Sequence, residues 1–379
     1  MSSNIILPPA MLGMLGGGQL GRFFVIAAHE MGYRVTVLDP DKNSPAGKIA
    51  DVHLCAAYDD SAALKKMAQT CEAITTEFEN VPASTLETLA QTCTVRPSAK
   101  AVSIAQHRVL EKQFIRDSGI PVAPFVVVNS PEDLPVDGEA IYPAILKVAR
   151  FGYDGKGQAR VANLTQAQEA FEGFKGEPCV LEKMLSLDYE VSVVLARDFE
   201  GNVASYPLAE NSHLNGILDV SIVPARAPKA IQDQARQLAI KIAEQLDYVG
   251  VLAVEFFVSN GELLANEMAP RPHNSGHYTI DANVTNQFEQ QLRALVGLPL
   301  GDNRLHSQAV MVNILGDVWR NGAEPSWDWI FAHSALKLHL YGKHEPRPGR
   351  KMGHFTVIGA DQETVIVSAI KAREELGIG

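Results

Sequence analysis

The chain has 379 residues, enough for two or three domains, and its 46% hydrophobic and 20% charged residues are ordinary for a globular protein. Its net charge of −11 argues against general binding to nucleic acid or to an anionic membrane, although a local basic pocket is compatible with it. The four scattered cysteines make no zinc or redox motif, no apolar run is long enough to span a membrane, and no secretory signal is recognisable, so we expect a cytoplasmic enzyme.

The first segment is typical of a βαβ unit. An apolar strand over 11–15 precedes Gly16-Gly17-Gly18-Gln19-Leu20-Gly21, and an amphipathic helix and a strand over 34–38 follow. The G-x-G-x-x-G pattern lets backbone amides at a helix N-terminus approach an anion closely. It indicates phosphate binding more firmly than NAD binding, for which Asp39 would be the ribose ligand. A dehydrogenase therefore stays open at this point.

Acidic residues follow the next predicted strand, over 73–76, in the run Glu77-Phe78-Glu79-Asn80. In an open α/β sheet the carboxyl ends of the strands face the ligand, so these acids are candidates for a substrate contact. An ordinary charged loop before the helix over 83–90 explains them equally well.

A single helix is predicted over 104–117, with Ser98 or Ser103 as its cap and Gly119 just beyond its end. It carries Arg108, whose position at the entry to a second domain suits a phosphate contact.

Lys147 lies inside an otherwise apolar strand over 144–148, which follows a strand over 121–128. A lysine there needs an anionic partner or a water path, and a phosphate is the preferred partner. The next run, Gly152-Tyr153-Asp154-Gly155-Lys156-Gly157-Gln158, is typical of a mobile loop whose amides wrap phosphates, with a plain hairpin turn as the alternative. Its spacing is not that of a Walker A loop.

The strand over 179–182 continues into Lys183-Met184-Leu185, whose edge amides are predicted to hydrogen-bond an adenine ring. Glu190 opens the strand over 191–196 and would reach a ribose. His213 lies in a polar, turn-rich segment, where a single histidine is more often structural than catalytic. An amphipathic helix over 230–246 presents an apolar face to the core.

Two apolar runs, 249–258 and 262–269, are predicted to form an antiparallel hairpin around Asn260-Gly261. A two-residue loop pairs Glu255 with Asn266, whereas a three-residue loop pairs Glu255 with Glu267 on the same face. Paired carboxylates on an apolar sheet need a cation, and Mg²⁺ suits them, although two exposed acids are the simpler alternative. Immediately beyond the hairpin lies a cationic and hydrogen-bonding group suited to a small oxyanion, namely Arg271, His273 and Asn274.

The last segment is predicted to be small and mostly β, with strands over 310–315, 335–340 and 355–358. The loop between the last two strands carries four cations, including Lys343 and Arg350, on a Pro- and Gly-rich chain. In an acidic protein this loop indicates a local anion site, with a solvated turn as the alternative.

Taken together, these motifs resemble the ATP-grasp superfamily and, within it, the N5-carboxyaminoimidazole ribonucleotide synthase family. The resemblance rests on Gly-Gly-Gln-Leu-Gly-Arg at 17–22, Gly-Tyr-Asp-Gly-Lys-Gly-Gln at 152–158, Asn-Glu-Met-Ala-Pro-Arg-Pro-His-Asn-Ser-Gly-His at 266–277 and Arg-Pro-Gly-Arg-Lys-Met-Gly-His at 347–354. It implies an α/β and α+β fold with three parts: a Rossmann-like domain (1–105), a two-lobed ATP-grasp domain (106–305) and a small mostly-β C-terminal domain (306–379).

The resemblance also implies a ligase that phosphorylates bicarbonate with ATP to carboxyphosphate and delivers CO₂ to 5-aminoimidazole ribonucleotide in purine biosynthesis. The catalytic set would be Lys147, Arg271, His273 and Asn274, with His273 a candidate general base. The nucleotide set would be Arg108, Lys147, the loop 152–158, Glu182, Lys183, Met184, Leu185, Glu190, His213, Asn266 and Glu267. Glu255 and Glu267 would bind Mg²⁺. The ribonucleotide set would be Gly18, Gln19, Leu20, Glu77 (or Glu79), Tyr153, Lys156, Lys343 and Arg350.

Three rival interpretations remain. Another ATP-grasp ligase, formate-using or similar to biotin carboxylase, would share the lobes and the magnesium acids but not the acceptor motifs. An NAD-dependent dehydrogenase would leave the acid pair unexplained, and a non-catalytic nucleotide sensor would not need the oxyanion cluster. Relatives are commonly dimers, so a homodimer is expected. Position 156 is lysine where relatives often carry arginine, which puts a bidentate phosphate contact there in doubt.

Overall fold

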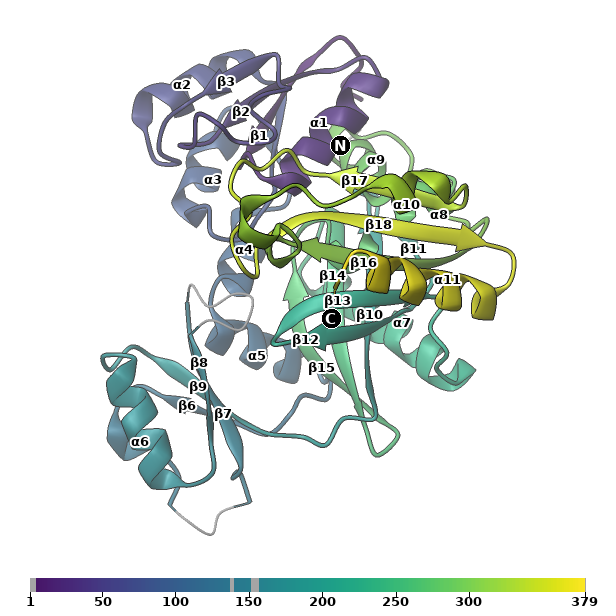
Figure 1. The fold of residues 1–379 in the computed structure, drawn as a ribbon. Helices are drawn as coiled ribbons and strands as arrows, with labels where there is room; N and C mark the ends of the chain where they lie inside the picture. The colour runs from purple at the N-terminus through teal and green to yellow at the C-terminus, as the bar shows by residue number, and fades with distance from the viewer. Residues whose placement is uncertain (1–4, 137–139, 151–156, 379) are drawn as a thin grey trace.

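A computed structural model describes residues 5–136, 140–150 and 157–378. Figure 1 shows three regions: an N-terminal α/β domain, a small lobe that projects from the main body, and a large sheet that carries the rest of the chain. Among the described residues, none of the helices is both long and apolar enough to cross a membrane.

The N-terminal region is a five-stranded sheet in the order β3-β2-β1-β4-β5, and its paired strands all run parallel. Parallel pairing requires crossover helices, which explains the alternation of strands and helices in this segment. Its elements are β1 (Met11–Leu15), α1 (Gln19–Glu30), β2 (Arg34–Leu38), β3 (Val52–Leu54), α2 (Ser61–Thr70), β4 (Ala73–Thr76), α3 (Ala83–Ala90) and β5 (Thr94–Val95).

The helix predicted over 104–117 is in fact two helices, α4 (Ala99–Ala105) and α5 (Arg108–Asp117). The backbone of His107 is extended, with φ −131° and ψ 104°, which ends one helix and starts the next. Ser98 caps α4 by accepting a hydrogen bond from the amide of Ala101, while Ser103 instead donates to the Lys100 carbonyl. The break turns Arg108 into the first residue of a new helix.

The small lobe is a four-stranded sheet in the order β6-β9-β7-β8. It consists of β6 (Phe125–Val128), β7 (Ala144–Val148), β8 (Gln158–Val161), α6 (Leu164–Gly173) and β9 (Cys179–Lys183). Because β9 lies between β6 and β7, it is an interior strand. The prediction that its amides lie at a sheet edge is therefore wrong. The amides of Lys183 and Met184 already donate to the carbonyls of Pro124 and Pro143.

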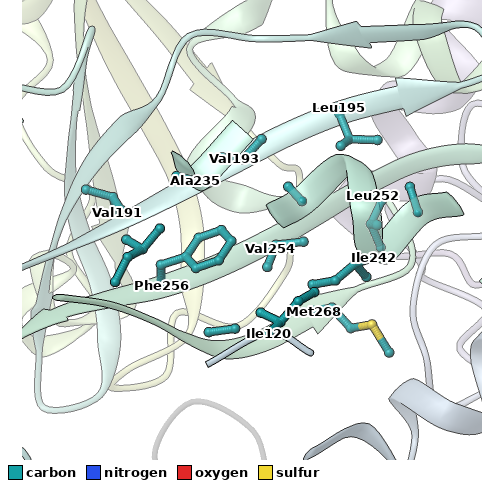
Figure 2. Packing of buried hydrophobic residues seen from close by; sticks show 14 of the residues in the cluster. Ile120, Val191, Val193, Leu195, Ala235, Ile242, Leu252, Val254, Phe256 and Met268 are labelled. Atoms are coloured by element: carbon teal, nitrogen blue, oxygen red, sulfur yellow. The ribbon is translucent and has the colours of Figure 1, made fainter. Parts of the chain in front are cut away.

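The large sheet runs β15-β14-β10-β12-β13-β16-β18-β17, and β11 pairs with β10 outside this path. Its first strands are β10 (Tyr189–Arg197), β11 (Val203–Ser205), β12 (Ala209–Leu214), β13 (Ile217–Val223), β14 (Gly250–Ser259) and β15 (Glu262–Ala269). The predicted amphipathic helix is α7 (Lys229–Gln245), and its apolar face packs on this sheet. Figure 2 shows Ala235 and Ile242 of α7 among side chains of β10 and β14 such as Val193 and Val254.

The hairpin of β14 and β15 has a register that neither predicted alternative describes. Its loop has two residues, Asn260 and Gly261, both at positive φ, and Ser259 pairs with Glu262. The register then shifts by one residue between Glu255 and Phe256, so that Glu255 pairs with Glu267. This irregularity allows a two-residue loop to bring the two acids together.

The C-terminal segment extends the same sheet, because β13 pairs with β16. Its elements are β16 (Gln308–Leu315), α10 (Asp328–Ala332), β17 (Leu336–Leu340), β18 (Lys351–Gly359) and α11 (Gln362–Glu375), preceded by α8 (Thr279–Ala282) and α9 (Gln287–Val296). Helix α11 was not anticipated from the sequence. It buries Val365 and Ala369 but exposes Val367 and Ile370, so its apolar residues do not mark one face.

Candidate functional site

A cavity of about 510 Å³ opens where the N-terminal domain, the small lobe and the large sheet meet. It brings together most of the residues singled out in the sequence. Its lining includes Gly18, Gln19, Leu20, Glu77, Glu79, Arg108, Lys147, Gln158, Glu190, His213, Glu255, Asn266, Glu267, Arg271, His273 and Asn274. Gly157 is described but does not line it, and Gly152, Tyr153, Asp154, Gly155 and Lys156 lie outside the described residues.

The carboxylates of Glu255 and Glu267 belong to directly paired residues on β14 and β15. Burial, together with the neighbouring Glu267, raises the pKa of the Glu255 carboxyl to about 7. Arg108 Nη1 lies 3.3 Å from Glu267 Oε2. A partly buried acid pair with mutual repulsion is a donor set that a divalent cation would stabilise, so the residues present fit Mg²⁺.

A further carboxyl group, Glu111 on α5, also lines the cavity and was missed in the sequence. It accepts a hydrogen bond of 2.6 Å from the amide of Met268, and burial raises its pKa to about 8. The signal that could have found it is helical spacing, since Arg108 and Glu111 are three residues apart on one face of α5.

Two lysines hold one buried carboxylate in the small lobe. Lys147 Nζ lies 3.1 Å from Glu182 Oε1, and Lys112 Nζ lies 3.1 Å from Glu182 Oε2. Burial would raise the pKa of Glu182, but the two ammonium groups outweigh it and lower the pKa to about 2. Lys147 therefore has an internal anionic partner, and both oxygens of Glu182 face lysines. Lys112, four residues after Arg108, was not predicted.

The oxyanion group predicted beyond the hairpin does line the cavity, but each side chain already has a protein partner. Arg271 Nε donates to Glu79 Oε2 at 2.6 Å. His273 Nε2 lies 3.4 Å from Glu255 Oε1, and burial and the nearby Arg271 hold its pKa well below the usual range. The side-chain amides of Asn274 and Asn313 donate to each other. Of the two acids left open, Glu79 is thus occupied by Arg271.

Glu77 occupies the helix N-terminus that the glycine motif builds. The amides of Gly18 and Gly21 both donate to its carboxylate, and burial raises its pKa. The amide of Gly17 donates to Asp39 at 2.7 Å. An internal carboxylate therefore takes the place expected for a phosphate, and Asp39 is not free to bind the ribose of a dinucleotide.

The cationic loop before β18 meets the cavity at one point. Lys351 lines the cavity, whereas Lys343 and Arg350 do not. Lys343 Nζ donates to the side-chain oxygen of Gln19 and to the Lys351 carbonyl, so it lies beside the lining. Arg350 donates to the Glu345 carbonyl within its own loop.

At the other end of the cavity, polar and apolar residues are set side by side. His213 Nδ1 lies 3.1 Å from Glu190 Oε2. Burial acts to lower the pKa of His213, but the contact with Glu190 acts against burial, and the pKa is raised overall. Ile145, Leu187 and Phe257 supply an apolar wall nearby. This end suits a flat ring with hydroxyl groups. Lys183, Met184 and Leu185 do not line it.

Comparisons with known proteins agree with this geometry. The chain matches family profiles described as a ribonucleotide synthetase preATP-grasp domain (10–106), an ATP-grasp domain (113–288) and a phosphoribosylaminoimidazole carboxylase C-terminal domain (309–367). The matches confirm the predicted fold class.

Two similar curated proteins are named N5-carboxyaminoimidazole ribonucleotide synthase. That of Bacillus subtilis is 45% identical over 94% of this chain and 93% of its own, and that of Brucella melitensis is 47% identical over 94% and 99%. Among solved structures, an ADP complex of an N5-carboxyaminoimidazole ribonucleotide synthetase has a TM-score of 0.90, 41% identity and 98% coverage of both chains. The Aspergillus clavatus synthase in complex with ADP and 5-aminoimidazole ribonucleotide has a TM-score of 0.90 at 32% identity, covering 98% of this chain and 99% of its own.

Proposed function

This chain belongs to the N5-carboxyaminoimidazole ribonucleotide synthase family of ATP-grasp ligases, and from that premise we propose how its cavity performs the reaction. The enzyme uses ATP and bicarbonate to carboxylate the exocyclic amine of 5-aminoimidazole ribonucleotide. The γ-phosphoryl group passes to bicarbonate, the resulting carboxyphosphate breaks down to CO₂ and phosphate, and the amine takes up the CO₂. The pairing of Glu255 with Glu267 beside Arg271 and His273 carries the residue assignment.

The nucleotide lies between the small lobe and the β14–β15 hairpin. Its adenine packs on the apolar wall, and Glu190 accepts from the ribose hydroxyls while His213 holds that carboxylate in place. The phosphates lie near Lys147 and Arg108, two cations that line the cavity. Phosphoryl transfer needs positioning and charge neutralisation, which this arrangement supplies.

Glu255 and Glu267 would hold Mg²⁺, with Asn266 next to them in the cavity lining. When bound, the ion neutralises charge on the β- and γ-phosphates. In its absence burial and the neighbouring Glu267 raise the pKa of Glu255 to about 7.

Bicarbonate binds beside the terminal phosphate, on Arg271 and His273. Arg271 has spare guanidinium N–H groups after its bond to Glu79, and the loop that carries both residues begins where β15 ends. Asn274 acts indirectly, because its side-chain amide is hydrogen-bonded to Asn313 and so holds the loop in place. Carboxyphosphate hydrolyses readily, so the cavity must also exclude water.

The ribonucleotide occupies the side of the cavity made by the N-terminal domain and Lys351. Glu77 is an acceptor, so it suits a hydroxyl or amine and repels a phosphate. The ribonucleotide phosphate is therefore assigned to Lys343 and Arg350, with Gln19 and Leu20 beside Lys343. Tyr153 and Lys156 complete this proposed set from outside the described residues. The three functional parts are proposed to divide at 105 and 305.

The experiment that tests this function is ADP release by the purified chain, with each substrate omitted in turn. We expect ADP release to require ATP, bicarbonate and 5-aminoimidazole ribonucleotide together. ADP release that depended on formate in place of bicarbonate, or on no acceptor at all, would refute the proposal in favour of another ATP-grasp activity.

The proposal extends to a homodimer in the cytoplasm. Exposed apolar side chains of Phe331 on α10 and Val367 and Ile370 on α11 offer one candidate surface, and all four cysteines are free thiols, which suits a reducing compartment. Light scattering should give twice the 41.1 kDa mass of the chain, and Val367→Asp should lower it to that of a monomer.

A further inference from the structure

Buried polar side chains form one hydrogen-bonded chain that ends on the ring of His273. Ser221 Oγ donates to Asn211 Oδ1 at 2.8 Å, and Asn211 Nδ2 donates to Ser192 Oγ at 2.9 Å. Ser192 Oγ donates in turn to Ser275 Oγ at 2.7 Å. Ser275 Oγ lies 2.9 Å from His273 Nδ1. The chain crosses the adjacent strands β13, β12 and β10 and reaches the cavity through the loop after β15.

The hydrogen bonds in this chain lead towards the ring. A hydroxyl has a single proton to donate, and an amide N–H can only donate. Ser192 Oγ accepts from Asn211 and donates its own proton to Ser275. Ser275 is then left with its proton for the ring nitrogen. His273 Nδ1 is therefore an acceptor.

A backbone hydrogen bond also indicates, independently, that His273 Nδ1 is an acceptor. The amide of Ser275 also donates to His273 Nδ1, at 3.3 Å, as the histidine caps the short 3₁₀ helix Asn274–Gly276. A ring nitrogen that receives two N–H or O–H groups carries no hydrogen itself. In the neutral imidazole the hydrogen is then on Nε2, the nitrogen that faces Glu255 Oε1.

We infer that His273 serves the reaction as a hydrogen-bond donor through Nε2–H and not as the general base for the acceptor amine. This inference rests on the proposed function, in which His273 lies against bicarbonate beside the metal carboxylates. An N–H group at Nε2, beside Glu255, would hydrogen-bond an oxygen of the bound bicarbonate and orient that anion for attack on the γ-phosphorus. Ser275, Ser192 and Asn211 are positioning residues, because they fix the ring and its tautomer without touching the substrate.

Two substitutions of His273 separate a donor from a base. His273→Gln keeps an N–H donor, whereas His273→Glu keeps only a base. The donor role predicts that the glutamine variant retains about a tenth of the wild-type kcat/KM for bicarbonate while the glutamate variant loses about 10²-fold, the order of the cost of misplacing a reactant. The reverse order, with glutamate active and glutamine inactive, would overturn the inference. Unchanged ADP binding shows that each variant is folded.

The positioning residues are tested with Ser275→Ala, and Ser259→Ala is the matched control. Ser259 is also a buried serine that donates to one carbonyl, that of Ser186, but it lies outside the chain of bonds. Ser275→Ala should lower kcat/KM for bicarbonate by about 10–100-fold with little change in the KM for ATP, as expected for a residue that orients a catalytic group. Equal effects on both substrates, or equal effects of the two variants, would mean a merely structural role.

A readout free of catalysis distinguishes failure of this inference from failure of the proposed function. Nitrogen NMR of the histidine-labelled protein should show His273 with a hydrogen on Nε2 and none on Nδ1, and the His273→Gln spectrum identifies the signals. A hydrogen on Nδ1 overturns the inference even if ADP release requires bicarbonate and the ribonucleotide. The expected tautomer in a protein without that activity leaves the donor geometry standing and refutes the function alone.

Discussion

Replacing Glu255 by glutamine is expected to stabilise the metal-free protein while abolishing ADP formation. In the folded chain the Glu255 carboxyl has a pKa of about 7 instead of the ordinary 4.5, because it is buried and faces Glu267. The folded state therefore binds a proton more tightly than the unfolded state, and stability is lost as the pH rises from 4.5 through 7. Each tenfold difference in proton affinity is worth about 1.4 kcal/mol, and the pKa moves from 4.5 to about 7, so ionised Glu255 costs about 3–3.5 kcal/mol at pH 8.

The measurement is urea denaturation of wild type and Glu255→Gln in the presence of a chelator. The gain in unfolding free energy should be about 3–3.5 kcal/mol at pH 8 and below about 1 kcal/mol at pH 5, where the folded carboxyl is already protonated. Glu262→Gln is the matched control, since Glu262 opens the same strand but is exposed. A variant that is no more stable at pH 8, or equally stabilised at both values, would refute the reasoning about the acid pair.

Three further predictions follow from the site and the core. Gly16→Ala should lower both stability and affinity for the ribonucleotide, because φ at Gly16 is +105° and an added Cβ would collide with Glu77. Equal KM values for the ribonucleotide in the variant and the wild type would contradict this. Burial holds the pKa of His277 and His354 well below 6.5 in the folded protein. Their full contribution to the free energy of unfolding should therefore be present above pH 6.5 and be lost below it, by up to about 2.7 kcal/mol per pH unit for the two histidines together. Denaturation at pH 5 to 7 measures this loss. Arg350→Ala should raise mainly the KM for the ribonucleotide, and an effect confined to ATP would assign the loop elsewhere.

The paired acids show how far local patterns carry a prediction. The Asn260-Gly261 signal predicted the hairpin correctly but left open a two-residue or a three-residue loop, and the structure has the two-residue loop. Glu255 nevertheless pairs with Glu267, the partner expected from the longer loop, because the register shifts by one residue between Glu255 and Phe256. Both predicted alternatives assumed a regular ladder, so neither combined the two-residue loop with the acid pair.

Other differences come from contacts between residues that are distant in the sequence. Glu77 lies 59 residues from Gly18, and no spacing rule says that it fills the helix terminus. Lys112 pairs with Glu182, 70 residues away (182 − 112), across α5 and β9. The glycine motif and the Lys147 strand were recognisable because each is defined by residues that are neighbours in the sequence. Their partners became visible only when the fold brought these segments together.

The pairing of β13 with β16 has a consequence for how the chain can be divided. Residues Val220–Val223 are bonded to Ala309–Val312, so the hairpin that carries the acids and the C-terminal strands belong to one continuous sheet. A fragment ending near residue 305 would leave β13 with an open row of amides and carbonyls. Such a fragment is expected to self-associate through that edge, so the ATP-binding part of this protein should be handled together with its C-terminal strands.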